Sequence, residues 1–319
     1  MGAPVNTRKM KSYILHIFYI LYRFNLIQGI FKRISNISFI FRLGSVGLYV
    51  SDLPRAKRLI LIAKAIGANL TWDNLITFLR SNSELDQEFV AYLICGSKGY
   101  FVEFGALDGV RGSNTFLLET KYEWRGLLAE AIPRLAESCQ INRSSPCCNV
   151  AVIGNLSFAA PNQSQLPNED SGFVSLNSST TSPKYGDGQT VTFATIQDEG
   201  RIGLSTISSY IDSDMHSSTR RQGFDLTEIP AISLLSLLEK YNAPKHINFL
   251  SIDTEGSEFD ILSDFPFEKY HFDFICIEHN HSVNEESIKR LMMKNGYTQI
   301  MKSISGGDAF FVRNKLDKK

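Results

Sequence analysis

The chain has 319 residues, of which 43% are hydrophobic and 21% charged, with 33 basic and 33 acidic side chains. This composition excludes wholesale disorder, a collagen-like structure and a small disulfide scaffold. The zero net charge argues against a nucleic-acid partner, because proteins that bind nucleic acid carry a basic face or stripe.

The charges are distributed unevenly along the chain. Residues 1–60 carry ten basic side chains and one acid, Asp52, so their net charge is +9 and that of the remainder is −9. Six basic residues, no acid and several aromatic side chains fall within residues 8–33. Polar residues such as His16 interrupt this stretch, and a spanning helix needs about 20 consecutive apolar residues. We therefore expect residues 8–33 to lie on an anionic membrane surface, with a helix packed on the domain or on a second subunit as the alternative.

The cysteines indicate the compartment. There are five, an odd number, and none has the C-x-x-C spacing of a redox or zinc motif. Several lie in apolar runs, where a reduced thiol behaves as a small hydrophobic side chain. We expect a cytoplasmic protein, with residues 8–33 at the inner face of a membrane.

Residues 52–95 show helical periodicity. Leucine and isoleucine recur at three- and four-residue spacing in 55–66, and Thr71 and Ser83 are suitable N-caps for two further helices. Residues 1–95 are therefore predicted to form a basic, apolar, helical N-terminal extension. The domain that follows is predicted to span 96–319.

From Tyr100 onward, short apolar runs alternate with amphipathic stretches. The runs predict strands at 100–104, 126–129, 148–153, 247–252 and 272–277. The amphipathic stretches predict helices at 114–121, 133–142, 232–241, 257–263 and 285–295. Strands separated by helices predict a parallel sheet covered on both faces, an α/β fold. The last two runs, 297–301 and 309–313, have no helix between them and predict an antiparallel hairpin at the sheet edge.

One segment breaks this alternation. Residues 155–228 are rich in serine, threonine, asparagine and glycine, and we expect an irregular polar insertion there. Connections of this length inside a domain are usually functional lids or disordered segments. We expect this one to build much of the pocket for the second substrate.

The end of the first strand predicts a cofactor site. Gly105 and Gly109 allow tight turns and close approach of a ligand, at the sheet edge where open parallel sheets bind ligands. The spacing is G-x-x-x-G, which is not the dinucleotide pattern. Glu103 would repel a pyrophosphate but accept hydrogen bonds from an ammonium group. Glu130 ends the next strand, where a carboxylate grips ribose hydroxyls. A nucleoside with an amino group and no phosphate is S-adenosylmethionine.

Several ordered motifs resemble the FkbM family of S-adenosylmethionine-dependent methyltransferases. They are Phe101–Gly109, Ser113-Asn114-Thr115, Trp124–Glu130, Leu250–Glu258, Ile277–Asn280 and Asp308–Val312. The resemblance covers about residues 95–315. It implies a Rossmann-like, seven-stranded class I methyltransferase fold and methylation of a hydroxyl on a sugar, a glycan or another natural product. It also implies that the cofactor is bound by Glu103, Gly105, Ala106, Asp108, Gly109, Ser113, Asn114 and Glu130.

Acidic residues follow the predicted 247–252 strand. Glu258 would lie in the first turn of the next helix, where an acid caps free amides. Asp253 and Glu255 lie nearer the cofactor, and burying both without a function would be costly. Together with His279 they are the candidates for the general base that removes the acceptor's hydroxyl proton. The residues alone do not rank these three.

The segment Glu278-His279-Asn280-His281, with Asp253 across the sheet edge, also has donor types for a divalent metal. Polar residues are common at strand ends, and we expect no metal there.

The sequence thus favours a cytoplasmic S-adenosylmethionine-dependent O-methyltransferase. Two other classes stay open: a metal-dependent hydrolase using Asp253, Glu255 and His279, and a non-catalytic, membrane-associated methyltransferase-like module.

Overall fold

The structure is a computed structural model that describes residues 52–83, 85–154 and 189–314. The membrane prediction for residues 8–33 and the first part of the predicted insertion lie outside the described residues. None of the described helices is long and apolar enough to span a membrane.

Three helices confirm the helical prediction for residues 52–95: α4 (Leu53–Ile66), α5 (Trp72–Phe78) and α6 (Gln87–Cys95). Thr71 caps α5 as predicted, because its side chain accepts the backbone N–H of Asn74. The predicted cap of α6 is wrong by three residues. The N-cap of α6 is Asp86. Ser83 lies three residues before it, and the Ser83 hydroxyl accepts the backbone N–H of Gln87.

The centre of the molecule is a seven-stranded sheet in the order β10-β11-β9-β8-β1-β2-β3. Neighbours pair in parallel except at β11, which is antiparallel to both β9 and β10. The predicted hairpin at the sheet edge is therefore confirmed. The strands are β1 (Tyr100–Phe104), β2 (Arg125–Glu130), β3 (Cys147–Asn149), β8 (His246–Ile252), β9 (His271–Glu278), β10 (Tyr297–Ile300) and β11 (Asp308–Arg313).

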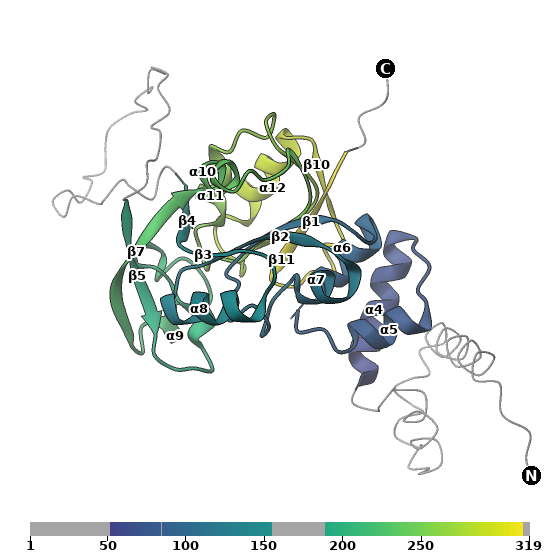
Figure 1. The fold of residues 1–319 in the computed structure, drawn as a ribbon, viewed down its shortest axis with the longest axis horizontal. Helices are drawn as coiled ribbons and strands as arrows, with labels where there is room; N and C mark the ends of the chain where they lie inside the picture. The colour runs from purple at the N-terminus through teal and green to yellow at the C-terminus, as the bar shows by residue number, and fades with distance from the viewer. Residues whose placement is uncertain (1–51, 84, 155–188, 315–319) are drawn as a thin grey trace, which may run out of the picture.

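Helices cover both faces of this sheet, as predicted (Figure 1). Alternate strand residues point to opposite faces, so Phe101 packs with α4–α8 and its neighbour Val102 packs with α10–α12. Helices α4–α6 thus share one hydrophobic core with the sheet. The remaining covering helices are α7 (Phe116–Tyr122), α8 (Pro133–Asn142), α10 (Leu234–Lys240), α11 (Glu258–Ser263) and α12 (Glu285–Lys294).

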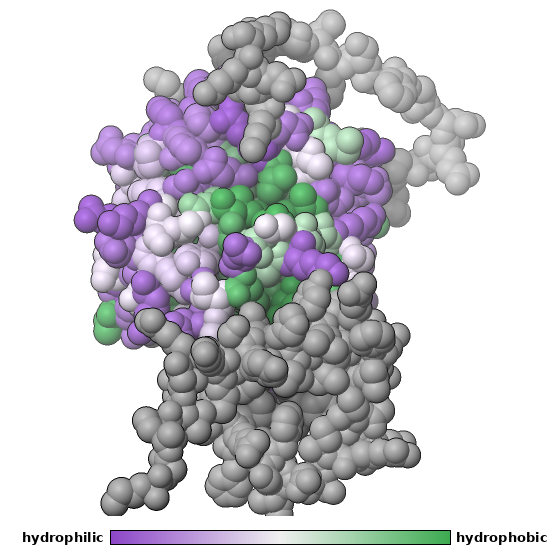
Figure 2. All heavy atoms as spheres, turned by 90° about the vertical axis from the view of Figure 1, so that its right-hand side faces the viewer, coloured by the Kyte–Doolittle hydropathy of each residue, from purple (hydrophilic) through white to green (hydrophobic). Residues whose placement is uncertain are grey.

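The helical layer α4–α6 is not fully covered. Some of its apolar side chains are only partly buried against the core, among them Ile66, Ile76 and Leu93. Figure 2 looks onto this side of the molecule and shows an apolar area at its centre, edged by hydrophilic residues.

A second sheet corrects two expectations. The run 148–153 is not one strand: β3 ends at Asn149, and β4 (Ala151–Ile153) joins another sheet in the order β4-β7-β5-β6. Residues 189–228 are not irregular, because they supply most of that sheet. Its elements are β5 (Thr190–Ile196), η3 (Ile202–Leu204), β6 (Thr206–Ile207), η4 (Ser208–Tyr210), α9 (Ser217–Arg220) and β7 (Phe224–Ser233).

Burial explains why this second sheet forms. In β5 the side chains of Val191, Phe193 and Ile196 are buried, and a third hydrophobic cluster joins two of them to Ile132 and Leu135 beside β2. Through this hydrophobic cluster the second sheet packs against the first at the carboxyl ends of β2 and β3. The second sheet therefore forms one wall of any site at that edge.

Candidate active site

A cavity of about 720 Å³ lies at the carboxyl ends of the central strands. Strand β1 pairs with β2 on one side and with β8 on the other, so the strand order reverses at β1. Ligands of open α/β sheets bind at such reversals of strand order. The volume of the cavity is typical of small-molecule sites, which span roughly 300–1,000 Å³. Five residues predicted from the sequence line it: Gly105, Asn114, Glu130, Asp253 and Glu255.

Gly105 is required by the backbone of this cavity. Its φ is +72°, a left-handed conformation that favours glycine. A Cβ atom built on it would lie 2.0 Å from the carbonyl oxygen of Asp253. The loops after β1 and β8 therefore approach each other as closely as they do only because residue 105 has no side chain.

Glu130 lies at the end of β2 and lines the cavity. Its two carboxylate oxygens accept the backbone N–H groups of Leu107 and Ile132, both at 2.8 Å. Burial nevertheless raises the pKa of Glu130 to about 7. Each carboxylate oxygen has a second lone pair, so the group has the capacity to accept further donors from a ligand.

Glu103 does not line the cavity. Its buried carboxylate accepts the Ser113 hydroxyl at 3.0 Å, the Asn114 N–H at 2.6 Å and the Thr115 hydroxyl. Arg143 lies 3.8 Å from the same carboxylate and is itself fully buried. Glu103 therefore supports the 113–115 turn, which presents Asn114 to the cavity.

Three other predicted cofactor residues, Ala106, Asp108 and Gly109, shape the loop after β1 without lining the cavity. Asp108 accepts the N–H groups of the two residues that follow Gly109, at 3.0 and 2.7 Å. A Cβ on Gly109 would lie 2.7 Å from Cγ of Arg143. Arg143 was not predicted from the sequence, yet it holds this loop through the Gly109 carbonyl and the Ser113 hydroxyl, both at 3.0 Å.

Three acids meet at the opposite wall of the cavity and form the acidic cluster: Asp253, Glu255 and Glu278. One carboxylate oxygen from each lies within 4.8 Å of the others. Burial, and then the nearby Asp253 charge, raise the pKa values of Glu255 and Glu278 well above their usual range. Asp253 and Glu278 also hydrogen-bond to each other, which requires a shared proton. The Oε2 atom of Glu278 is buried and accepts no hydrogen bond from the residues that the structure describes.

A buried arginine balances part of this charge. Arg220, at the end of α9, is 1% exposed and lies 2.6 Å from Glu255. It also binds both carboxylate oxygens of Asp214, at 2.8 and 2.9 Å. Sequence reasoning missed Arg220 because it lies in the segment expected to be irregular. The ion pairs tie that segment to the end of β8.

Glu258 has the capping role expected for it. Its buried carboxylate accepts the backbone N–H groups of Thr254 and Gly256 at 3.0 and 2.9 Å. It orders the loop that carries Asp253 and Glu255, and it does not line the cavity.

His279 is buried beside the cavity and does not line it, whereas Asn280 and His281 do. The Nδ1 atom of His279 accepts the backbone N–H of His281 at 3.1 Å. Burial lowers the pKa of the imidazole below its usual value. Of the three predicted general bases, the structure brings Asp253 and Glu255 to the cavity, together with Glu278.

Comparison with known proteins adds a family to this geometry. The model of the methyltransferase FkbM domain matches residues 103–302. No curated protein matches the chain. The crystal structure of methyltransferase FkbM from Methylobacillus flagellatus KT is similar at 11% identity, with a TM-score of 0.39. The similarity covers 82% of this chain and 60% of that one. The FkbM domain model matches more than half of this chain, so the chain belongs to the FkbM methyltransferase domain family.

Proposed function

We propose that the protein is an S-adenosylmethionine-dependent methyltransferase of the Rossmann-like class I fold, and that its acceptor is a hydroxyl of a sugar, a glycan or another natural product. The observation that carries the proposal is the cavity at the β1/β8 reversal, which has Gly105 and Glu130 on one wall and the acidic cluster on the other. Family membership supports the activity, and the one antiparallel strand of the central sheet, β11, supports the fold.

The residues of the cavity fit this cofactor. Glu130 has free acceptor capacity for the two ribose hydroxyls, and Gly105 leaves backbone room beside it. The acidic cluster is suited to a ligand with positive charge, because among the described residues its three acids outnumber the partner cation, Arg220. S-adenosylmethionine, when bound, supplies a methyl group on a cationic sulfur. We assign Glu103 an indirect role, through the 113–115 turn.

The Asp253–Glu278 pair is the proposed general base. Neighbouring carboxyl groups raise each other's pKa, so the pair holds its shared proton to a higher pH than a single acid does and is the stronger base once that proton has left. Glu255 is less suited, because Arg220 and Asn280 already donate to it at 2.6 and 3.3 Å. Asp253 lines the cavity and is partly exposed, so an acceptor hydroxyl can reach it.

The first test concerns Glu130. We expect Glu130→Ala to weaken the affinity for S-adenosylhomocysteine by about 1–3 kcal/mol, since it removes charge-assisted hydrogen bonds to the ribose. Isothermal titration calorimetry measures this change. Glu137→Ala, an exposed acid on the adjacent helix α8, is the matched control and should bind like the wild type. Equal affinity of both folded variants would contradict the assignment.

The pH dependence of binding gives this test a second readout. Ribose hydroxyls donate hydrogen bonds, so they favour the ionised carboxylate of Glu130, whose pKa is about 7. Affinity should therefore rise by about ten-fold between pH 6 and pH 8, as that carboxyl loses its proton. Glu130→Gln does not titrate and should flatten this dependence.

The cytoplasmic location and the contact of residues 8–33 with an anionic membrane belong to the same proposal. The five cysteines without C-x-x-C spacing support the location, and the excess of basic and aromatic side chains in residues 8–33 supports the membrane contact. We expect the full chain to co-sediment with anionic vesicles at low salt and less at high salt, whereas a chain beginning at Asp52 stays in solution. Equal sedimentation of both chains would contradict the membrane contact.

A further inference from the structure

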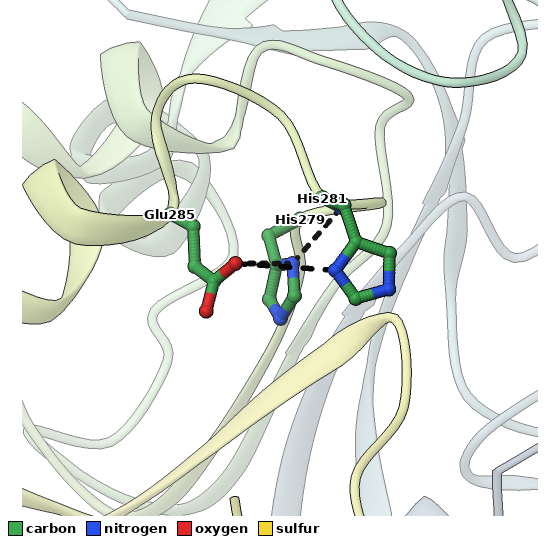
Figure 3. A group of neighbouring side chains, drawn as sticks. All are labelled: His279, His281 and Glu285. Carbon is green, nitrogen blue, oxygen red and sulfur yellow. Dashed lines mark hydrogen bonds and ion pairs between the residues drawn. The ribbon is translucent and has the colours of Figure 1, made fainter.

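Two imidazoles and a carboxylate converge beside the cavity, and together they form the histidine–glutamate cluster: His279, His281 and Glu285. Figure 3 shows the Glu285 carboxylate facing both rings. One of its oxygens lies 3.8 Å from Nδ1 of His279 and 3.9 Å from Nδ1 of His281. These separations are too long for hydrogen bonds. One ligand atom from each of the three residues lies within 4.8 Å of the others, so a single ion can reach all three.

The backbone assembles this cluster at a cost. Asn280 and His281 follow β9 with φ values of +41° and +53°, a left-handed conformation that is uncommon for residues other than glycine. The N–H groups of His279 and Asn280 both donate to the Gly307 carbonyl, at 2.9 and 3.1 Å. The resulting turn brings both rings to one side, and Glu285 reaches them from the first residue of α12. Strained backbone of this kind concentrates at functional sites.

The donor set selects a class of ion. Imidazole nitrogen suits divalent transition metals such as zinc and iron, and two histidines with one carboxylate hold such ions while leaving coordination positions open. Zinc–ligand bonds of about 2.0–2.1 Å place neighbouring donor atoms about 3.4 Å apart in a tetrahedron. The two observed separations of 3.8 and 3.9 Å are a few tenths of an ångström longer.

Although the sequence alone predicts no metal at this strand end, we propose that His279, His281 and Glu285 bind a divalent first-row transition metal ion of the zinc and iron type. His281 lines the cavity, so the open coordination positions would lie at its rim. The site differs from the acidic cluster, and its existence does not depend on the proposed methyl transfer.

Metal binding requires that one hydrogen bond be replaced by a metal–nitrogen bond. In the structure the His281 N–H donates to Nδ1 of His279 at 3.1 Å, and a metal ion would take over that lone pair. The side chains of His281 and Glu285 are 64% and 29% exposed, so an ion can enter from solvent. Lys302 lies 3.7 Å from the second oxygen of Glu285 and is itself 60% exposed, so it can move away.

The test is titration of the full chain with Co²⁺, followed by visible absorption, and displacement of Co²⁺ by Zn²⁺. We expect one equivalent to bind. His281→Asn and Glu285→Gln should each weaken binding at least about ten-fold, because each removes one of three ligands. Asparagine is chosen at residue 281 because it tolerates positive φ. Both substituted side chains reach the surface, so the variants should fold.

Two matched controls keep the result specific. His246→Ala alters a histidine that stacks on His271 and pairs with Asp273 at the other end of the strands. Glu286→Gln alters the acid next to Glu285, which pairs with Lys289. Both should bind Co²⁺ like the wild type. Absence of saturable binding, equal binding by all four variants, or a sulfur-to-cobalt charge-transfer band from cysteine ligands would each overturn the proposal.

Discussion

Replacing Asp253 with asparagine is expected to lower kcat by about 10²–10⁴-fold, the usual contribution of a general base. The affinity for S-adenosylhomocysteine should change little, since an interaction special to the transition state appears in kcat. Turnover is measured with a labelled methyl group, on the acceptor found by screening sugars. Calorimetry gives the affinity.

The pH profile of Asp253→Asn distinguishes a base from a merely structural acid. In the wild type, burial and then the Asp253 charge raise the pKa of Glu278, so the rate should increase with pH as the shared proton is lost. The variant lacks that charge, so the pKa of Glu278 falls. Any residual activity should therefore have its acid limb at lower pH.

A matched control accompanies this variant. Asp264→Asn changes an exposed acid at the C-terminal end of α11, the helix that follows the same loop, and should leave both quantities unchanged. If Asp253→Asn loses cofactor affinity and keeps its turnover at saturation, Asp253 belongs to the cofactor pocket and the base is another group.

Local patterns in the sequence predict most of the central sheet. The strands β1, β8 and β9 are short apolar runs bounded by glycine or acidic residues, and α8 begins with Pro133 at its first turn. Each of these signals lies within one element. The helices and strands that carry such signals were therefore placed within a few residues of their observed bounds.

The second sheet was missed because its signals are weaker and its pairing is not local. In β5, apolar and polar residues alternate from Thr190 to Phe193, which predicts a strand, but the surrounding segment is polar. Its partner β7 is mostly exposed and lies far along the chain, with Thr190 opposite Pro230. The apolar run 148–153 hides a turn at Val150, where the chain passes from one sheet to the other.

The residues of the candidate site also fall into those that have a local signal in the sequence and those that do not. Gly105, Glu130 and Asp253 could be predicted because each lies at the carboxyl end of a central strand or directly after it, and the carboxyl ends of parallel strands meet at one edge. Glu103 is the last residue but one of β1, but alternation turns its side chain under the loop, where Ser113 and its neighbours bind it. Arg220 has no local signal at all, because both of its partners come from other elements.

Arg220→Met is expected to lower the free energy of unfolding by about 3–5 kcal/mol, the usual effect of removing one partner from a buried ion pair. The substitution leaves the carboxylates of Asp214 and Glu255 without their cation in a site where Arg220 itself is 1% exposed. Denaturant unfolding measures the change. Arg221→Met is the control: this neighbour pairs with Asp212 at the surface, and its loss should have no measurable effect.

The pH dependence of this loss tests whether uncompensated charge is its cause. Burial already raises the pKa of Glu255 well above its usual value with Arg220 present, and loss of the cation raises it further. An acid whose pKa is raised in the folded state stabilises that state at low pH, and this stabilisation disappears as the pH rises through the folded-state value. The destabilisation by Arg220→Met should therefore be smallest below about pH 4.5, where the Glu255 carboxyl is protonated, and should grow as the pH rises. Adding Glu255→Gln removes one of the stranded charges and should restore part of the stability at neutral pH. A loss that is the same at both pH values, and is not relieved by the second substitution, would mean that Arg220 acts through packing of its side chain and not through its charge.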